Sequence, residues 1–469
     1  MLRRLFALVI LVACASACTA PPVPFSLRFT VFPTTQGADV IVEVHGGRDD
    51  LAWVGFAAGP GAPADLPQRV HSVQARTLDG RRLPQRQHGE AGYQIELEDS
   101  SWQLGYSLDL RPRADDDIFY RSSVREDDYL VLVGSDAWAR FYTTPEALAI
   151  APNRRPGGAV LEARAAFNLP EQPTPWKVAT TAWARSPRTF ELSEHPTASV
   201  FALGPFEIRD IEEVPGLRLA VHPRWSALNE SIDSLTGKLL LSHRERLGPP
   251  GSTTALALMH PLPQPLGPAG GLRTAGMVRG RSLILYAGAN PRIKPHDPQL
   301  REAMAVFLGH EFFHLWVPSG VQVTRELSWL SEGWAMHMGR LAAVEVGWLS
   351  EPASVQRLQD AYRRYLDIGG YRAGSLPEAS MGSESRRDLL YLRGELVFRL
   401  LERQWALTNT GNFEAELWRA LADAYDGRTP LDAKSVRSSL ASLVDHGTVR
   451  RYVEGTSPLT PSALGLRRR

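Results

Sequence analysis

The hydrophobic pattern of this 469-residue chain changes its period near residue 215, and that change limits the fold more than any other feature. Residues 24–210 consist of short segments in which apolar and polar residues alternate, separated by turn residues such as Gly46-Gly47. Several such segments at regular spacing predict a β-sandwich-like domain. The clearest of them are Ser26–Phe32, Asp39–Val44, Tyr93–Leu97 and Trp176–Thr181.

Beyond residue 215 the pattern is that of buried strands followed by amphipathic helices. Leu217–Val221, Thr254–Met259 and Ser282–Tyr286 are short apolar runs that predict strands, and a Pro- and Gly-rich loop covers Pro261–Gly271. Apolar residues at intervals of three and four predict a helix over Leu228–Leu247. Further helices are expected near residues 298–316, 326–347, 352–366, 384–405, 412–425 and 432–444.

These patterns divide the chain into four parts. Residues 1–18 read as a signal peptide, 24–210 as the β-rich domain, 215–345 as an α+β domain, and 346–460 as a C-terminal helical region. Because strands are followed by packed helices, the predicted fold class of the whole is α+β.

Charge and cysteine content exclude several classes of function. The formal net charge is +1, which gives no electrostatic reason to expect a nucleic-acid partner. Cys14 and Cys18 are the only cysteines, so the body of the protein has no disulfide, no thiolate zinc ligand and no cysteine nucleophile. Stability is therefore expected to come from buried cores.

The N-terminus has the parts of an export signal. Arg3 and Arg4 precede an apolar run over Leu5–Ala13 that is too short to span a bilayer, and small residues follow. Cys14 and Cys18 both stand where a bacterial lipoprotein signal would place the lipidated cysteine, and the sequence does not choose between them. A plain signal peptide cleaved before Cys18 is the alternative. The prediction is an exported, lipid-anchored protein on the periplasmic side of the envelope, and similarity to bacterial sorting rules favours the outer membrane.

The strongest local motif is His310-Glu311-Phe312-Phe313-His314, in an apolar helical segment. On a helix, positions i and i+4 share one face, so the imidazoles of His310 and His314 can bind one zinc ion. Glu311 projects from the adjacent position, where it can act as a general base without binding the metal. Two buried, hydrogen-bonded histidines are the alternative interpretation, and the five-residue pattern favours the metal site.

A catalytic zinc ion takes three protein ligands. Glu332 lies among Trp, Leu and Ala side chains, where a carboxylate is costly unless it is paired or bound to a metal. Glu326 is the weaker choice, because it lies near the start of its helix, where it can favour the helix dipole. His337 points to another face and is expected beside the site or on the surface. Glu332 is therefore the predicted third ligand.

A His-Glu-x-x-His helix followed by Glu332-Gly333 resembles the gluzincin zinc metallopeptidases, and Tyr391-Leu392-Arg393-Gly394 resembles the Tyr-x-x-Gly helix of the aminopeptidase N and glycyl aminopeptidase families. The resemblance implies a thermolysin-like catalytic domain, a peptide substrate and one Zn²⁺ ion per chain. It also implies His310, His314 and Glu332 as ligands, Glu311 as catalytic base and Tyr391 as the oxyanion-stabilising residue. Core packing is the alternative role for Tyr391.

The glycyl aminopeptidase family is the most similar, over about residues 170–460 and including the tail Val449–Thr456. The chain is expected to lack the PDZ domain that many members carry. Members also have Gly-Gly-x-Glu before the metal helix, where the Glu binds the free amine of the substrate. Gly270-Gly271-Leu272-Arg273 occupies that place here, so Gly270, Gly271 and Arg273 are the predicted substrate-binding residues. Arg273 either meets a substrate carboxylate or is a solvated loop charge.

The function expected from these observations is a zinc-dependent, aminopeptidase-like hydrolase of the bacterial envelope. An extended peptide is expected to lie along Ser282–Tyr286 as an edge strand. Other functions on the same residues are an endopeptidase, a non-peptidase hydrolase such as an epoxide hydrolase, and a non-catalytic zinc-binding lipoprotein. A substrate-binding or assembly lipoprotein that acts through its β-rich domain is a further alternative. Oligomeric state is not predicted.

Overall fold

The computed structural model describes most of the chain, in two compact units. Unit 1 comprises residues 1–178 and 182–204, and unit 2 comprises residues 179–181 and 205–469. The described residues are 25–46, 50–56, 65–90, 92–112, 123–142, 160–171, 175–192, 196–250, 255–261, 272–289, 298–382 and 386–467. The predicted signal peptide, with Cys14 and Cys18, lies outside them.

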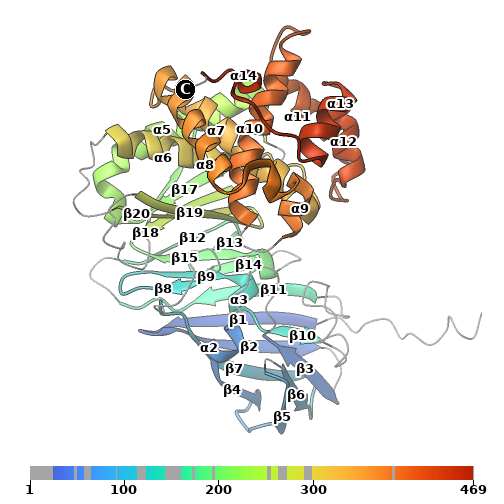
Figure 1. The fold of residues 1–469 in the computed structure, drawn as a ribbon. Coiled ribbons are helices and arrows are strands. Elements are labelled where there is room, and N and C mark those ends of the chain that lie inside the picture. Colours follow the sequence, from blue (N-terminus) through green and yellow to red (C-terminus); the bar gives the residue numbers. More distant parts are fainter. Residues whose placement is uncertain are drawn as a thin grey trace, which may run out of the picture. The chain divides into compact units, whose positions relative to one another are not determined.

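Up to residue 204 the chain forms three sheets, with strand orders β13-β14-β11-β1-β2-β7-β4, β10-β3-β6-β5 and β12-β15-β9-β8 (Figure 1). The sheet-rich N-terminal part and the α+β class are confirmed. The elements are β1 (Phe25–Pro33), β2 (Gly37–Gly46), β3 (Leu51–Gly55), α2 (Leu66–Arg69), β4 (Val70–Thr77), β5 (Gln85–His88), β6 (Gly92–Glu96), β7 (Ser101–Asp109), β8 (Val124–Arg125), β9 (Leu130–Val133), α3 (Gly134–Ala137), β10 (Arg140–Tyr142), β11 (Val160–Phe167), β12 (Lys177–Thr180), β13 (Trp183–Ser186), β14 (Thr189–Leu192) and β15 (Val200–Gly204).

Alternating strands explain the core of unit 1. Along β2 the buried and exposed residues alternate, because successive side chains of a strand point to opposite faces. Aromatic rings fill the middle of the core: the ring centroids of Phe167 and Phe201 are 4.9 Å apart, and those of Phe29 and Trp138 are 4.7 Å apart. Such tilted contacts are favoured over face-to-face stacking.

Unit 2 contains a five-stranded sheet of order β16-β17-β18-β20-β19. Its strands are β16 (Glu207–Asp210), β17 (Leu217–Val221), β18 (Ala255–Pro261), β19 (Leu272–Arg279) and β20 (Ser282–Ala289). β17, β18 and β20 are parallel neighbours, whereas β19 pairs antiparallel with β20. The expectation that Ser282–Tyr286 forms an edge strand is wrong, because β20 lies between β18 and β19. The sheet order ends at β19, a segment for which the sequence predicted no strand.

Helices follow the sheet and gather on one side of it (Figure 1). The longest are α5 (Asn229–Leu247), α6 (Pro298–Phe313), α7 (Ser328–Glu345), α8 (Glu351–Asp367), α10 (Arg387–Trp405) and α11 (Phe413–Ala424). The shorter ones are α9 (Leu376–Met381), α12 (Ala433–Ala441), α13 (His446–Thr448), a π-helix (Val449–Glu454) and α14 (Pro461–Leu464). Three of them have side-chain caps: Ser350, Asn412 and Asp432 accept hydrogen bonds from the backbone of the first turn of α8, α11 and α12.

The helices pack on one face of the sheet, and strand alternation defines that face. Leu283 and Leu285 of β20 belong to the same buried cluster as Leu308 and Phe312 of α6. Leu283 and Leu285 oppose Val278 and Gly276 of β19. Since opposed residues of neighbouring strands point to one face, this part of β19 also faces the helices.

A buried arginine joins the C-terminal segment to α10. Arg393 is fully buried, and its guanidinium donates to the carbonyls of Tyr452 and Gly455 at 3.1 and 3.0 Å and to the hydroxyl of Tyr365 at 2.7 Å. The backbone carbonyls at the end of the π-helix thereby gain a side-chain donor. Within the part of the chain that the structure describes, no helix has the length and apolarity needed to cross a bilayer.

Candidate metal centre

The histidines of the motif sit at the C-terminal end of α6. His310 lies within the helix, and His314 is the first residue beyond it. The helix ends in a tighter turn of the 3₁₀ type: the backbone N–H of His314 donates to the carbonyl of Glu311, three residues back, at 3.1 Å. The ring centroids of His310 and His314 are 5.0 Å apart and nearly perpendicular. The helix predicted to reach residue 316 is thus three residues shorter, without separating the two rings.

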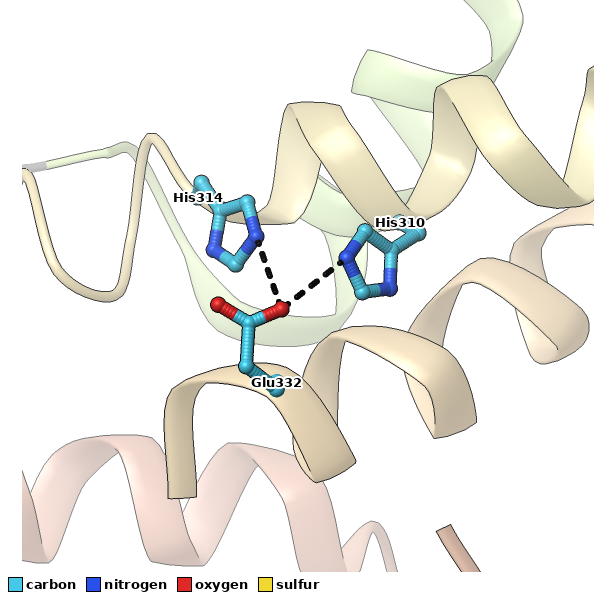
Figure 2. Close-up of side chains that lie close together, drawn as sticks. All are labelled: His310, His314 and Glu332. Atoms are coloured by element: carbon cyan, nitrogen blue, oxygen red, sulfur yellow. Dashed lines mark ion pairs between the residues drawn. The ribbon is translucent and has the colours of Figure 1, made fainter. Parts of the chain in front are cut away.

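Glu332 reaches these rings from α7, as Figure 2 shows. Its Oε2 lies 3.4 Å from Nε2 of His310 and 3.8 Å from Nε2 of His314. The three possible ligand atoms all lie within 4.8 Å of one another. A tetrahedral zinc ion with ligands at 2.0–2.1 Å holds its donor atoms about 3.3 Å apart. The spacing therefore fits one zinc ion with little adjustment.

A hydrogen bond selects the tautomer of His314. Its Nδ1 lies 2.9 Å from the carbonyl oxygen of Val317, and a carbonyl can only accept, so Nδ1 carries the proton in the neutral ring. The lone pair is then on Nε2, which faces Glu332. This arrangement, with one ring nitrogen bonded to backbone and the other directed at the metal, is typical of zinc-binding histidines.

Burial and the charges of neighbouring groups shift the pKa values of His310, Glu311 and Glu332. Burial alone would raise the pKa of Glu332, but the charge of His314 and a hydrogen bond with His310 lower it to about 2. Burial alone would lower the pKa of His310, and its hydrogen bond and ion pairing with Glu332 raise it. Burial raises the pKa of Glu311. The carboxylate of Glu332 is thus charged, as a metal ligand must be.

Glu311 lies beside the ligands and touches the sheet. One of its oxygens is 3.9 Å from Nε2 of His310, and the side chain is buried. The carboxylate also rests against the backbone of Gly276 in β19. The group is therefore within reach of the metal position without being one of the three clustered ligands.

Tyr391 of α10 completes the cluster. Its ring centroid is 6.0 Å from that of His310, and its hydroxyl is hydrogen-bonded to Glu332. Burial, together with the negative charges of Glu332 and Glu311, holds the pKa of Tyr391 well above its usual value. The phenol therefore stays protonated and can donate.

Two glycine pairs bring the three helices together. Gly309 of α6 faces Gly339 of α7, where a Cβ on Gly339 would lie 2.6 Å from the backbone nitrogen of His310. Gly333 of α7 faces Gly394 of α10, where a Cβ on either would come within 2.6 Å of the partner's Cα. The first contact fixes the approach of α6 to α7, the helices that bring together the candidate ligands. The second fixes the approach of α10, which carries Tyr391.

A buried polar network lies farther along α7. Arg340 donates to Glu395 of α10 at 2.8 Å and to Nδ1 of His337 at 3.2 Å, and Nε2 of His337 lies 3.1 Å from Glu414 of α11. His337 is fully buried, so the expectation that it could lie on the surface is wrong. The network ties α7, which carries Glu332, to α10 and α11.

His337, Glu402 and Glu414 also form a group with metal-ligand spacing. Since arginine can only donate, Nδ1 of His337 must accept from Arg340, and the ring proton of neutral His337 is then on Nε2. That proton is donated to Glu414, whose pKa burial alone would raise but the hydrogen bond from His337 lowers. The group is a hydrogen-bonded cluster, because a metal at Nε2 would require a fully deprotonated ring.

The predicted substrate loop is only partly visible. Gly270 and Gly271 lie outside the described residues, as does the side chain of Arg273. The backbone of Arg273 belongs to β19 and pairs with Gly288. The residue that the structure places against Glu311 is instead Gly276, which the sequence analysis missed. Its only signal was a glycine inside an apolar segment, which often marks a close backbone approach.

The comparisons with known proteins establish the fold. No family model matches the chain, and no curated protein matches it either. Among solved structures, an aminopeptidase N family protein from Idiomarina loihiensis superposes with a TM-score of 0.77 at 14% identity, over 93% of this chain and 77% of that one. An M1 zinc metallopeptidase from Deinococcus radiodurans has a TM-score of 0.53 at 15% identity, over 94% of this chain and 96% of that one.

A variant of the Deinococcus radiodurans M1 zinc metallopeptidase, solved with a Tyr-Ser-Ala substrate, has a TM-score of 0.50 at 14% identity, over 94% of this chain and 96% of that one. At such identities the similarity concerns the fold. The chain thus has the α+β fold of M1 zinc metallopeptidase structures.

Proposed function

We propose that this protein is a zinc-dependent peptidase whose metal is held by His310, His314 and Glu332. The observation that carries the proposal is the convergence of these three ligand atoms from two helices, with Glu311 and Tyr391 beside them. The fold it shares with M1 zinc metallopeptidases supports the same reaction class. One Zn²⁺ ion per chain is proposed.

Each side chain then has one task. A bound zinc ion would supply Lewis acidity, which polarises a peptide carbonyl and acidifies water. Glu311 takes a proton from the attacking water on its carboxylate and passes it to the departing amine. Its raised pKa favours both transfers, because a base works best when its pKa is near the working pH. Tyr391, held protonated, donates its hydrogen bond to the oxyanion.

We propose an aminopeptidase-like mode, which the fold shared with the aminopeptidase N family protein from Idiomarina loihiensis supports, and a peptide substrate, which the Tyr-Ser-Ala complex supports. A second candidate is cleavage within a chain. It is favoured by β19, where Thr274 and Val278 occupy the same face as Gly276 and, among the described positions of that face, present no carboxylate to a free amine. The two modes differ in whether a blocked N-terminus prevents cleavage.

The test is zinc content and turnover of peptides with free and blocked N-termini, on protein lacking residues 1–18, with Glu311→Gln alongside. We expect one zinc per chain and a loss of about 10²–10⁴-fold in kcat for the variant, since it keeps the shape of the side chain but not the base. Full activity in Glu311→Gln would remove Glu311 from the mechanism. Zinc without any turnover would leave a structural metal site, and no zinc would refute the proposal.

We also propose that the protein is exported and lipid-anchored in the bacterial envelope. The support is the sequence alone: Arg3 and Arg4, the apolar run Leu5–Ala13, and the two cysteines Cys14 and Cys18. Metabolic labelling with a fatty acid tests this in Cys14→Ser and Cys18→Ser variants. Label that persists in both variants, or is absent from the wild type, contradicts the proposal.

A further inference from the structure

Gly276 occupies a special place on β19. The strand ends the sheet order, and Gly276 is paired with Leu285 of β20. Opposed residues of neighbouring strands point to the same face of a sheet, and Leu285 belongs to the same buried cluster as residues of α6. Gly276 therefore lies on the face of β19 that the helices cover. A side chain at position 276 would therefore point towards α6.

No side chain fits there, because the carboxyl group of Glu311 occupies the space. A Cβ built on Gly276 would overlap the carboxyl carbon and both oxygens of Glu311. Glu311 is 6% exposed, and its Oε1 lies 3.9 Å from Nε2 of His310. The carboxylate thus stands next to a strand backbone and near a histidine of the candidate metal site.

We propose that Gly276 is a positioning residue for Glu311: the bare backbone of β19 sets where the carboxylate stands relative to the metal ligands. The inference rests on the proposed role of Glu311 as the base. It explains why a glycine, which usually weakens a strand, stands in the interior of β19. A position on the sheet, outside the His310–His314 motif, thereby determines the geometry of proton transfer.

Gly276→Ala separates positioning from folding. The atoms that the new methyl group would meet are the free end of a flexible side chain, so the fold adjusts by moving the Glu311 carboxylate rather than the backbone. A misplacement of about 1 Å in a reacting group can lower the rate about 10²-fold. We expect kcat to fall about 10²-fold, while zinc content and the unfolding midpoint stay close to wild type.

The matched control is Gly105→Ala. Gly105 also lies inside an antiparallel strand, β7, and a Cβ there would meet only the carbonyl of Gln74 at 3.9 Å. Both variants change the backbone entropy of a strand glycine in the same way, and only Gly276→Ala adds a methyl group against the base. Gly105→Ala is expected to keep wild-type kcat.

Gly276→Ala in a Glu311→Asp background tests the contact between residues 276 and 311. Glu311→Asp shortens the side chain by one methylene and makes room for the methyl group. In that background Gly276→Ala is expected to cost less than about threefold in kcat, against about 10²-fold alone, because partners in contact are not additive. Equal losses in both backgrounds would mean that the methyl group acts on something other than Glu311, and would overturn the inference.

Crystal structures of the wild type and of Gly276→Ala provide a readout without activity. We expect the Glu311 carboxylate to move away from β19 and the ligands His310, His314 and Glu332 to stay. A carboxylate that stays in place, or a variant with wild-type kcat, overturns the positioning role. A wild type that binds zinc but hydrolyses no peptide refutes the proposed function instead, and the crystal comparison then still decides whether Gly276 sets the position of Glu311.

Discussion

Unit 1 and unit 2 differ in the histidines that they bury. At the centre of unit 1 lie aromatic rings such as Phe29, Phe167 and Phe201. All six buried histidines of the described residues belong to unit 2, namely His222, His243, His260, His310, His314 and His337. Buried Glu395 and Glu414 are in unit 2 as well, whereas the described histidines of unit 1 are exposed.

This difference predicts which kinds of substitution should destabilise each unit. Burial of aromatic surface is favourable in itself. A buried charge is costly unless a partner compensates it, and removing that partner costs more than the pair contributed. Unit 2 therefore has many positions at which a single polar change is severe. Unit 1 has fewer of them, among them Arg69 and Asp136, so a change of volume should matter more there. The following experiments test this contrast, from the largest expected effect to the smallest.

The largest effect is expected at the proposed metal centre. His314→Ala removes one of the three proposed ligands, and we expect zinc binding and turnover to be lost together because two ligands hold zinc poorly. Zinc content after desalting and hydrolysis of a peptide measure both. His45→Ala, an exposed histidine in unit 1, is the control and should change neither. One equivalent of zinc in His314→Ala would refute the ligand set.

A volume change should dominate in unit 1. Phe201 is fully buried and lies within 5.7 Å, by ring centroids, of Phe167 and Phe190. Phe201→Ala leaves a cavity, and we expect a loss of about 4 kcal/mol in the free energy of unfolding. Denaturant unfolding followed by hydrogen exchange of unit 1 peptides measures it. A loss under about 1 kcal/mol would show that this core collapses around the cavity.

A polar change should be nearly as severe in unit 2. Glu395→Gln leaves the buried Arg340 without its carboxylate, and we expect a loss of about 3 kcal/mol. Arg340→Met with Glu395→Leu removes both charges and should recover much of that loss. If the double variant is no more stable than Glu395→Gln, the cost does not come from an uncompensated charge.

Acid should destabilise unit 2 before unit 1. Burial lowers the pKa of His243 to about 4 and that of His260 to about 3, whereas both titrate near 6.5 when unfolded. Since the unfolded chain binds protons first, stability is complete above about pH 6.5 and falls as the pH drops towards 4. Each histidine should cost roughly 2 kcal/mol at pH 5.

Hydrogen exchange of each unit between pH 7 and pH 5 measures this acid effect. His243→Gln keeps a donor for the carbonyl of Gly309 but cannot titrate, so it should flatten the pH dependence of unit 2. An equal response of both units to acid would contradict the contrast between them.

Much of the fold could be read from hydrophobic periodicity. The strand predicted over Leu217–Val221 has those bounds in the structure, and the helix predicted over Leu228–Leu247 begins one residue later. β19 was missed because Leu272–Arg279 contains Gly276, lacks clear alternation, and follows a Pro- and Gly-rich stretch. Its place at the end of the sheet order depends on antiparallel pairing with β20, a contact that periodicity does not encode.

That His310, His314 and Glu332 lie together could be predicted for a physical reason. Helix geometry places His310 and His314 together whatever the rest of the fold does, and a lone carboxylate among apolar residues pointed to Glu332. The contact between Glu311 and Gly276 could not be predicted, because it arises only when β19 packs against α6. The sequence contains the four glycines that lie between the helices, but it does not indicate which of them pair, because the pairs form only when the helices pack.

Those glycine pairs limit how the centre can be transplanted by design. Helices usually pack with axes 8–10 Å apart, a spacing set by the side chains between them. At Gly309 with Gly339, and at Gly333 with Gly394, no side chain stands between the backbones. If a His-Glu-x-x-His segment were grafted onto a bundle of ordinary spacing, the carboxylate that supplies the third ligand would lie too far from the two histidines. The smallest portable form of this centre is therefore three helices with four glycines, rather than a set of ligands.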